Sequence, residues 1–317
     1  MVMILFSAKI SSKHQERLKV NYPKQDFMFC ENQTALEQHI SEAEIVVTFG
    51  RDLSAKLIEQ AHQLKWIMVM SAGLEDLPFK EIKKKGILVT NTRGIHKVQM
   101  AEYAISMLLQ VYRQGKVIMK NEQEHIWDKS VRMQEITNKT LIVVGTGAIG
   151  QEVARLATAF RMKTIGVSRS GRPVEFFDEN YKQDEISLLL PEADFVVSVL
   201  PSTDETKGFF TYEHFRLLPE HAVFLNMGRG NVVSTEDLLK VIQNKEIAHV
   251  VLDVFEEEPL PEDHAFWQAE NITITPHISG LSPYYMVRAL EIFEPNLDTY
   301  LTGKGAYMNE IDPTRGY

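Results

Sequence analysis

The chain has 317 residues, and at roughly 100–200 residues per domain this length predicts two domains. Hydrophobic residues make up 44% and charged residues 24%, which excludes a disordered, collagenous or low-complexity chain and predicts a soluble globular protein. Lys and Arg number 34 against 43 Asp and Glu, a formal charge of −9 that repels nucleic-acid phosphates and anionic lipid. We therefore expect no nucleic-acid partner.

The sequence shows no targeting or membrane-spanning segment. Residues 1–13 contain a short apolar run without a preceding basic stretch or a following small-residue cleavage site, so no signal peptide is predicted. The apolar runs are all too short to cross a bilayer, so no membrane association is expected. Cys30 is the single cysteine, which excludes an intrachain disulfide and a multi-thiolate metal site. These features predict a cytoplasmic protein without a metal.

Short apolar runs alternate with stretches of helical periodicity, a pattern typical of βαβ units and a mostly parallel sheet. The first series of expected strands covers residues 3–6, 45–49, 66–70 and 87–90, with helices such as 54–62 and 80–85 between them. The second series covers residues 141–144, 164–167, 195–200, 223–226, 250–253 and 272–275. The pattern predicts an α/β protein with two such series.

Two long amphipathic helices are predicted outside these series. Residues 98–119 are expected to form one helix, because apolar side chains from Ala101 to Tyr112 fall on a common stripe. Such a helix could link two domains or pack against another subunit. Residues 284–301 predict a second amphipathic helix, and residues 302–317 are polar and expected to be extended.

The run GTGAIG at residues 145–150 follows an apolar strand and opens a helical stretch at 151–160. In such a motif Gly145 allows the tight turn, and Gly147 lets backbone amides approach a pyrophosphate. Gly150 lets the helix pack close to the strand. Because strand and helix stand where the motif needs them, we predict dinucleotide binding by this turn, including Ala148 and Ile149.

Residues 167–172, at the end of the next strand, read VSRSGR. Proteins that bind NAD place an Asp or Glu near this point, where it holds the ribose 2′-hydroxyl. Here Ser168, Arg169 and Ser170 offer a cation and hydroxyl donors instead, which suit a 2′-phosphate. The residues favour NADP over NAD; the alternatives are NAD itself and a solvated basic loop.

Polar segments follow three later strands, where open α/β sheets bind their ligands. They are NMGRG at 226–230, DVFEEEPL at 253–260 and PHISG at 276–280. Together with SAG at 71–73, AEY at 101–103 and LP at 200–201, they form an ordered set along nearly the whole chain. This set resembles the D-isomer-specific 2-hydroxyacid dehydrogenase family.

The resemblance implies two Rossmann-like domains, each a doubly wound parallel sheet. Residues 97–282 would bind the dinucleotide, and residues 1–96 with 283–317 would form a discontinuous substrate (catalytic) domain. The implied activity is hydride transfer between NAD(P)H and a small 2-keto acid, giving a D-2-hydroxy acid. The family also implies a homodimer formed around residues 98–119.

The resemblance assigns catalytic roles to Arg229, Glu258 and His277. An imidazole near neutral pH can give and retake the proton of the substrate oxygen, so His277 is the expected general acid/base. A carboxylate at Glu258 would orient that ring and favour its charged form. The planar fork of Arg229 suits the carboxylate and carbonyl of the substrate.

The remaining site residues also follow from the resemblance. Backbone amides around Ala72 and Gly73, together with Ser71, are expected to receive the substrate carboxylate. Further expected dinucleotide contacts are Leu200, Pro201, Thr206, Met227, Gly228 and Asp253. His264 and Trp267 match the family pattern too, but we expect packing roles for them.

Within the family, the basic loop at 168–172, the SAG segment and the short chain most resemble glyoxylate and hydroxypyruvate reductases. One alternative is an NAD-dependent phosphoglycerate- or lactate-type dehydrogenase. Such an enzyme would differ in its cofactor preference and would have a larger or more basic substrate pocket, which residues such as Arg51 and Lys13 could line. Another is a non-enzymatic dinucleotide sensor or corepressor-like protein, which would bind dinucleotide without turnover.

Overall fold

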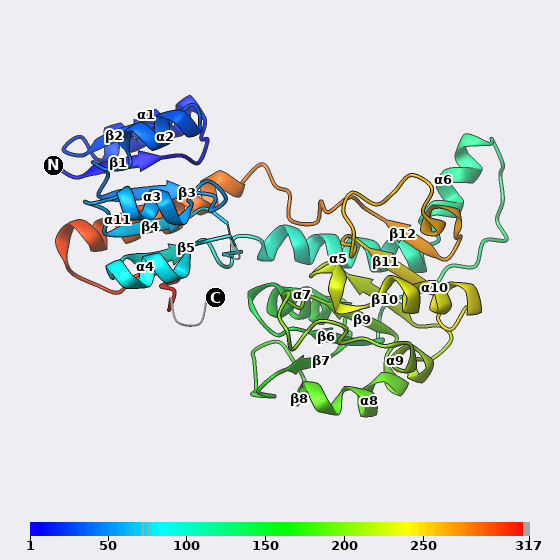
Figure 1. The fold of residues 1–317 in the computed structure, drawn as a ribbon. Helices are drawn as coiled ribbons and strands as arrows, with labels where there is room; N and C mark the ends of the chain where they lie inside the picture. Colours follow the sequence, from blue (N-terminus) through cyan, green and yellow to red (C-terminus); the bar gives the residue numbers. More distant parts are fainter. Residues whose placement is uncertain (72, 75, 313–317) are drawn as a thin grey trace. The chain divides into compact units, whose positions relative to one another are not determined.

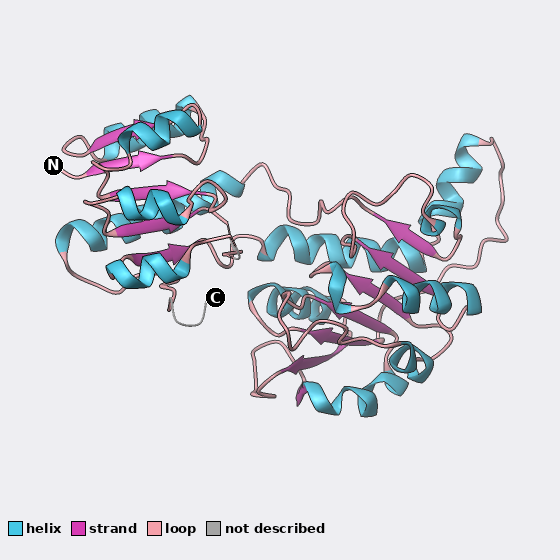
Figure 2. Ribbon diagram, in the orientation of Figure 1, coloured by secondary structure: helices cyan, strands magenta, loops and turns pink. Residues whose placement is uncertain are grey.

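The alternation of apolar strands and amphipathic helices builds two separate parallel sheets, each in its own compact unit. Unit 1 comprises Met1–Ile95 and Pro283–Tyr317, and unit 2 comprises His96–Ser282. Figure 1 shows the computed structural model, which describes residues 1–71, 73–74 and 76–312. Helices flank the sheet of each unit (Figure 2). The predicted α/β class with two parallel sheets is therefore confirmed.

Unit 1 is built on a five-stranded sheet in the order β2-β1-β3-β4-β5, and every neighbouring pair is parallel. The strands are β1 (Met3–Phe6), β2 (Asp26–Phe29), β3 (Ile45–Thr48), β4 (Trp66–Val69) and β5 (Leu88–Asn91). The helices are α1 (Ser12–Asn21), α2 (Gln33–His39), α3 (Ala55–Gln60), α4 (Phe79–Lys85) and α11 (Tyr285–Thr302).

Successive strand residues in unit 1 point to opposite faces and are buried on both, as expected for a parallel sheet covered on two sides. Leu5 and Ile67 pack in one core cluster with residues of α2, α3 and α4. Ile4 and Met68 pack in the other cluster with α1 and with Phe293 of α11. The C-terminal helix thus completes the sandwich that the N-terminal strand begins.

Unit 2 contains a seven-stranded sheet in the order β12-β11-β10-β9-β6-β7-β8, again parallel throughout. The strands are β6 (Thr140–Val144), β7 (Lys163–Ser168), β8 (Glu179–Lys182), β9 (Phe195–Ser198), β10 (Val223–Asn226), β11 (His249–Leu252) and β12 (Ile272–Ile274). The α-helices are α5 (Lys97–Tyr112), α6 (Gly115–Gln123), α7 (Ala148–Ala159), α8 (Ile186–Leu189), α9 (Tyr212–Leu217) and α10 (Thr235–Asn244). Short 3-10 turns are η1 (Gln183–Glu185), η2 (Leu190–Glu192), η3 (Gly230–Val232) and η4 (Ala265–Gln268).

Two helical layers enclose this sheet. Val143 and Val197 belong to the core cluster that contains α5 and α7, whereas Ile142 and Val196 belong to the cluster that contains α8, α9 and α10. The alternation places α5 and α7 together on one face, where their contact is the most extensive between helices. The helix that follows the glycine motif therefore packs directly on α5.

The prediction of one helix over residues 98–119 is wrong. Helix α5 ends at Tyr112 and α6 begins at Gly115, with Gln114 between them in the left-handed conformation at φ 52°. Met119 falls on the stripe at seven residues from Tyr112, and the residues before it, Val117 and Ile118, are apolar too, which concealed the break. Apolar periodicity gives no information on backbone dihedral angles. The helix ends because Gln114 adopts the left-handed conformation, which is rare for a residue other than glycine.

Two strands escaped prediction, and both lie at an edge of their sheet. Neither β2, with sequence DFMF, nor β8, with sequence ENYK, has a fully buried residue. An edge strand pairs on one side only and is less deeply covered. β8 lacks the apolar run that marks a central strand, whereas β2 has a short run, Phe27–Phe29, that was not recognised. Of the tail expected to be extended, Glu310 bridges Thr90, and residues 313–317 lie outside the described residues. No helix within the described ranges is long and apolar enough to span a bilayer.

Candidate functional site

The strand order of unit 2 contains a switch point between β6 and β9. The chain proceeds from β6 to β7 on one side and from β9 to β10 on the other, so the loops after β6 and β9 lead away in opposite directions. Open α/β sheets bind ligands in the crevice at such a point, outside the carboxyl ends of the strands. The GTGAIG turn follows β6, and the Leu200-Pro201 segment follows β9.

The glycine turn is packed too closely for side chains at two of its three glycines. Gly145 has φ +108°, and a Cβ there would lie 2.9 Å from Cγ2 of Val199. A Cβ on Gly150 would lie 2.0 Å from the carbonyl oxygen of Gly145. At Gly147, in contrast, no described atom lies within 4 Å of a Cβ position.

Gly147 is also the N-cap of the 12-residue helix α7, and among the described residues no side chain caps it. The first N–H groups of that helix therefore face open space, at the end of a helix dipole that favours negative charge. A pyrophosphate fits this position, because it needs backbone donors and the room that a side chain would occupy. The residues present are thus compatible with a bound dinucleotide.

The loop after β7 is held by its own hydroxyls. The Gly171 N–H donates to Oγ of Ser168 at 3.2 Å, and the Arg172 N–H donates to Oγ of Ser170 at 3.4 Å. The Arg169 side chain is 70% exposed and lies 3.9 Å from a carboxylate oxygen of Glu205. The loop after β7 therefore contains the guanidinium of Arg169 and the hydroxyls of Ser168 and Ser170. An acidic residue at this point would repel a phosphate.

The segments after β9 and β10 come into direct backbone contact. A Cβ on Gly228 would lie 2.5 Å from the carbonyl oxygen of Leu200. Leu200 and Met227 are both buried, so these two residues present backbone rather than side chain to the crevice. Thr206 is also buried, and its hydroxyl donates to the Pro201 carbonyl at 2.6 Å, which fixes this turn from inside.

Asp253 follows β11 and is fully buried. Its Oδ1 accepts hydrogen bonds from the Thr275 hydroxyl at 2.5 Å and from the Ile278 N–H at 2.9 Å, and its Oδ2 accepts the Ser279 N–H at 3.0 Å. Its backbone carbonyl accepts the His277 N–H at 2.9 Å. Both carboxylate oxygens thus fasten residues 275–280, which we call the His277 loop. This role of Asp253 was not predicted, although an acidic residue at the end of a buried strand was a signal for it.

His277 and Glu258 form a direct pair. Nδ1 of His277 lies 2.8 Å from Oε2 of Glu258, and the other oxygen, Oε1, accepts the Phe255 N–H at 2.9 Å. The side chains are 51% and 37% exposed, respectively. With Nδ1 engaged by the carboxylate, Nε2 is the ring nitrogen available for proton exchange. His277 has φ +53°, a conformation that an L-residue adopts only where its surroundings hold it.

Arg229 follows β10 and stands between two glycines. Its backbone carbonyl accepts from the Asn226 amide at 2.9 Å, and its guanidinium Nη1 donates to the Gly228 carbonyl at 2.9 Å. A Cβ on Gly230 would lie 1.9 Å from the Phe255 carbonyl carbon, so the loops after β10 and β11 touch. Arg229, Glu258 and His277 therefore follow three neighbouring strands, β10, β11 and β12, at the carboxyl ends of the sheet.

Unit 1 carries the other predicted substrate segment, after β4. The Ser71 hydroxyl donates to the Gly73 carbonyl at 2.8 Å, which tightens this turn. Ala72 lies outside the described residues.

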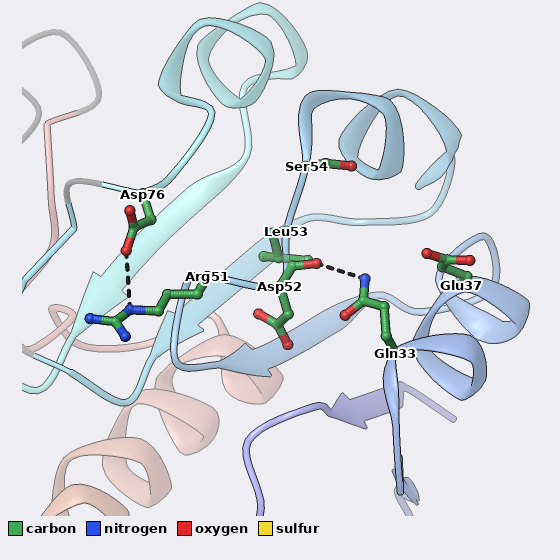
Figure 3. A pocket seen from close by; sticks show the side chains of 7 residues that line it. All are labelled: Gln33, Glu37, Arg51, Asp52, Leu53, Ser54 and Asp76. Carbon is green, nitrogen blue, oxygen red and sulfur yellow. Dashed lines mark hydrogen bonds and ion pairs between the residues drawn. The ribbon is translucent and has the colours of Figure 1, made fainter.

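A pocket in the same unit lies beside the end of β3 (Figure 3) and is lined by Gln33, Glu37, Arg51, Asp52, Leu53, Ser54 and Asp76. Arg51 pairs with Asp76 at 3.3 Å, and the pocket also contains two other carboxylates, so its charge does not suit a phosphate.

Residues 105–279 match the family model described as "D-isomer specific 2-hydroxyacid dehydrogenase, NAD binding domain". The chain belongs to this family. A glyoxylate reductase from Thermofilum pendens is 31% identical over 258 residues, covering 80% of this chain and 76% of that protein. A glyoxylate reductase from Thermococcus litoralis is 31% identical over 278 residues, covering 85% and 84%.

Solved structures agree with this assignment. A D-isomer-specific 2-hydroxyacid dehydrogenase family protein from Aeromonas salmonicida superposes with a TM-score of 0.87 at 33% identity, covering 98% of this chain and 99% of that one. An NADPH-dependent glyoxylate/hydroxypyruvate reductase from Sinorhizobium meliloti, in complex with NADP and sulfate, superposes with a TM-score of 0.82 at 26% identity, covering both chains completely. The predicted family and the predicted NAD(P) cofactor class are confirmed. This 2-hydroxyacid dehydrogenase is an NAD(P)-dependent oxidoreductase that acts on 2-keto and 2-hydroxy acids.

Proposed function

We propose that this 2-hydroxyacid dehydrogenase reduces a small 2-keto acid to the D-2-hydroxy acid, with His277 as general acid, Glu258 as its partner and Arg229 as the substrate-binding cation. The observation that carries the proposal is the contact of 2.8 Å between Nδ1 of His277 and Glu258, at the carboxyl ends of the sheet, where the Arg229 loop also lies. An acid, its counter-ion and a carboxylate-binding cation are the groups that this reduction requires.

A dinucleotide held at the GTGAIG turn would supply the hydride. His277 supplies the proton: its charged ring keeps Nδ1 on Glu258 and gives the Nε2 proton to the substrate carbonyl oxygen. Glu258 holds the orientation of the ring, and its other carboxylate oxygen is held by the Phe255 N–H. In the oxidative direction neutral His277 takes the proton back.

Arg229 receives the substrate carboxylate and stabilises the charge that develops on the carbonyl oxygen. A contact of the substrate carboxylate with the backbone amides around residues 71–73 stays a prediction. On this proposal, residues 97–282 bind the dinucleotide and residues 1–96 with 283–317 form the substrate domain. Leu200, Met227 and Gly228 would contact the dinucleotide through their backbone, because their side chains are buried or absent.

NADP is the proposed preferred cofactor. Ser168, Arg169 and Ser170 offer a charge-assisted site for the 2′-phosphate, and none of residues 168–172 is acidic. The Sinorhizobium meliloti relative, whose structure contains NADP, supports the same preference. Arg169 has a carboxylate of Glu205 within 3.9 Å, so part of its charge is already balanced, and NAD stays an alternative.

Glyoxylate or hydroxypyruvate is the proposed substrate, supported by the activities named for the relatives. A phosphorylated substrate is less well supported, because the pocket beside β3 contains three carboxylates against Arg51. A pure sensor of dinucleotide is also less well supported, since it would have no need of the His277–Glu258 pair.

We propose a homodimer formed through α6 and the segment after it. Apolar side chains gather there in exposed positions: Val117, Ile118, Met119, Ile126 and Trp127, the last 88% exposed. Apolar surface of this kind is costly in water and marks an interaction site. A second copy of the chain is the occupant that the family implies, and light scattering showing a monomer would contradict it. A cytoplasmic location stays a prediction.

The proposed activity is tested by following loss of absorbance of NADPH and NADH in parallel with glyoxylate, hydroxypyruvate, pyruvate and a branched 2-keto acid. We expect turnover of the two smallest polar substrates, faster with NADPH. Binding of NADPH without turnover of any of the four would contradict the proposal and support the sensor alternative.

A further inference from the structure

One face of helix α5 holds both ends of the His277 loop. His96 is the N-cap of α5, and Gln99 and Tyr103 follow at spacings of three and four residues, which place all three on the same side of a helix. Tyr103 contacts Thr275 at the start of the loop, and Gln99 and His96 contact Gly280 at its end. None of these three side chains has been given a role by the family resemblance or by the proposed mechanism.

At the start of the loop, three residues form a hydrogen-bonded chain with a defined direction. The Thr275 hydroxyl donates its proton to Oδ1 of Asp253 at 2.5 Å. The oxygen of that hydroxyl is then an acceptor, so the Tyr103 hydroxyl, 2.7 Å away, is the donor to it. Burial raises the pKa of Tyr103 far above its usual range, so the phenol keeps the proton that this bond requires.

At the end of the loop, the carbonyl of Gly280 is the shared acceptor. The buried amide of Gln99 donates to it at 3.1 Å, and Nδ1 of His96 lies 3.4 Å from it. The imidazole also packs against the backbone, since a Cβ on Gly280 would lie 3.2 Å from Nδ1 of His96. Burial, together with the positive charge of Arg229, lowers the pKa of His96 and favours its neutral form.

The conformation of His277 explains why the loop needs such anchors. At φ +53° the residue lies in the left-handed region, which L-residues rarely adopt, so the fixed ends must hold it there. Asp253 fastens the middle of the loop, and α5 fastens its two ends. We infer that His96, Gln99 and Tyr103 are positioning residues that hold the His277 loop in the geometry required for proton transfer.

The inference rests on the proposed role of His277, and Tyr103→Phe tests it most directly because it removes a single hydroxyl. The matched control is Tyr112→Phe on the same helix, since the Tyr112 hydroxyl is buried without a hydrogen-bond partner among the described residues. Loss of one neutral hydrogen bond is expected to lower kcat about fivefold in Tyr103→Phe, with the KM for NADPH within about twofold of the parent. Tyr112→Phe should change neither value.

A double-mutant cycle distinguishes positioning from general destabilisation. If Tyr103 acts through Thr275, then Tyr103→Phe should cause no further loss of kcat in a Thr275→Val background. Gln99→Leu, which acts at the other end of the loop, should still lower kcat in that background. Independent losses from Tyr103→Phe and Thr275→Val, or an unchanged kcat in Tyr103→Phe, would overturn the inference.

Amide hydrogen exchange provides a readout that needs no activity. The N–H groups of Ile278 and Ser279 are bonded to Asp253, so they should exchange several-fold faster in Tyr103→Phe than in the parent or in Tyr112→Phe. If the parent reduces no keto acid, the proposed function fails, and the exchange rates still decide whether α5 holds the loop. Unchanged protection of both amides would refute the anchoring.

Discussion

Nδ1 of His277 lies 2.8 Å from Oε2 of Glu258, and the same carboxylate accepts the backbone N–H of Phe255 through Oε1. The Phe255 N–H therefore holds one oxygen of the Glu258 carboxylate, while the other oxygen holds the imidazole of His277. If His277 exchanges the substrate proton as proposed, Nε2 is the ring nitrogen through which it does so. The strength of this arrangement can be examined by changing either partner.

His277→Asn is expected to abolish reduction while the fold and the dinucleotide site persist. Asn tolerates the left-handed backbone that residue 277 adopts at φ +53°, which Ala does less well, so the loss would report on chemistry. Removing a general acid should lower kcat by about 10²–10⁴-fold. The affinity for NADPH, measured by fluorescence titration, should stay within about twofold. Turnover at the parent rate would remove His277 from the mechanism.

Glu258→Gln should lower kcat. The amide can still occupy the position beside Nδ1 of His277, but it no longer offers the carboxylate that holds and orients the ring for proton transfer. The neighbouring exposed Glu257→Gln is the matched control, because it removes the same charge from the same loop. Equal kcat values for Glu258→Gln and Glu257→Gln would show that the contact between Glu258 and His277 is not required.

Arg169→Ala should weaken NADPH more than NADH. If the guanidinium contacts the 2′-phosphate, its loss removes a charge-assisted bond, and the ratio of kcat/KM for the two cofactors should fall about tenfold. Arg172→Ala provides the comparison, because that residue lies in the same exposed loop. A larger change in the ratio for Arg172→Ala, or none for either variant, would place the phosphate elsewhere.

The central strands and the glycine motif were predictable from sequence, because each depends on a local pattern. Strands such as β1 and β10 match their predicted limits, and GTGAIG identifies its own turn through the glycines. The break at Gln114 was missed, because the left-handed residue is a glutamine and the adjacent Gly115, which was the available signal, is the first residue of α6. The edge strands β2 and β8 lacked the deep burial on which the pattern depends.

The residues of the candidate site were recognised by type, whereas their supports were visible only in the structure. His277 and Glu258 are 19 positions apart, and nothing in that spacing specifies a contact. The hydroxyl of Tyr103 is 172 positions from Thr275, so its bond arises only once α5 packs beside the last strands. Asp253 was expected at the nicotinamide, yet its carboxylate is engaged by the His277 loop, a role for which burial was the missing information.

Gly147→Ala and Gly150→Ala should separate binding from folding within one motif. No described atom lies within 4 Å of a Cβ at Gly147, so Ala there should leave the melting temperature unchanged and weaken the dinucleotide by occupying space beside the pyrophosphate. A Cβ at Gly150 would meet the Gly145 carbonyl oxygen at 2.0 Å, which forces α7 away from the sheet and should lower the melting temperature by several degrees. Thermal unfolding with and without NADPH measures both effects. Equal destabilisation by the two variants would contradict the close packing assigned to Gly150 alone.

His249 should make the protein sensitive to mild acid. Burial, assisted by the charge of Lys116, lowers the pKa of His249 to about 4, below its ordinary value of 6.5, and Nε2 contacts the Thr273 hydroxyl at 2.9 Å. Because the unfolded chain binds this proton more readily, stability is unaffected above pH 6.5 and declines as the pH falls from 6.5 towards 4. The full loss is on the order of 3 kcal/mol at the lower limit.

His249→Gln can retain a bond to Thr273 without titrating, so its free energy of unfolding should vary less over that interval. Urea unfolding at pH 7.5, 6, 5 and 4.5 compares the two proteins. If the free energy of unfolding falls with pH equally in the two proteins, another group causes the loss of stability in acid. The free energies of unfolding of the parent and of His249→Gln should begin to differ near pH 6.5, and the difference should grow as the pH falls. Carboxylates, whose ordinary pKa values are near 4, would cause such a difference only at lower pH.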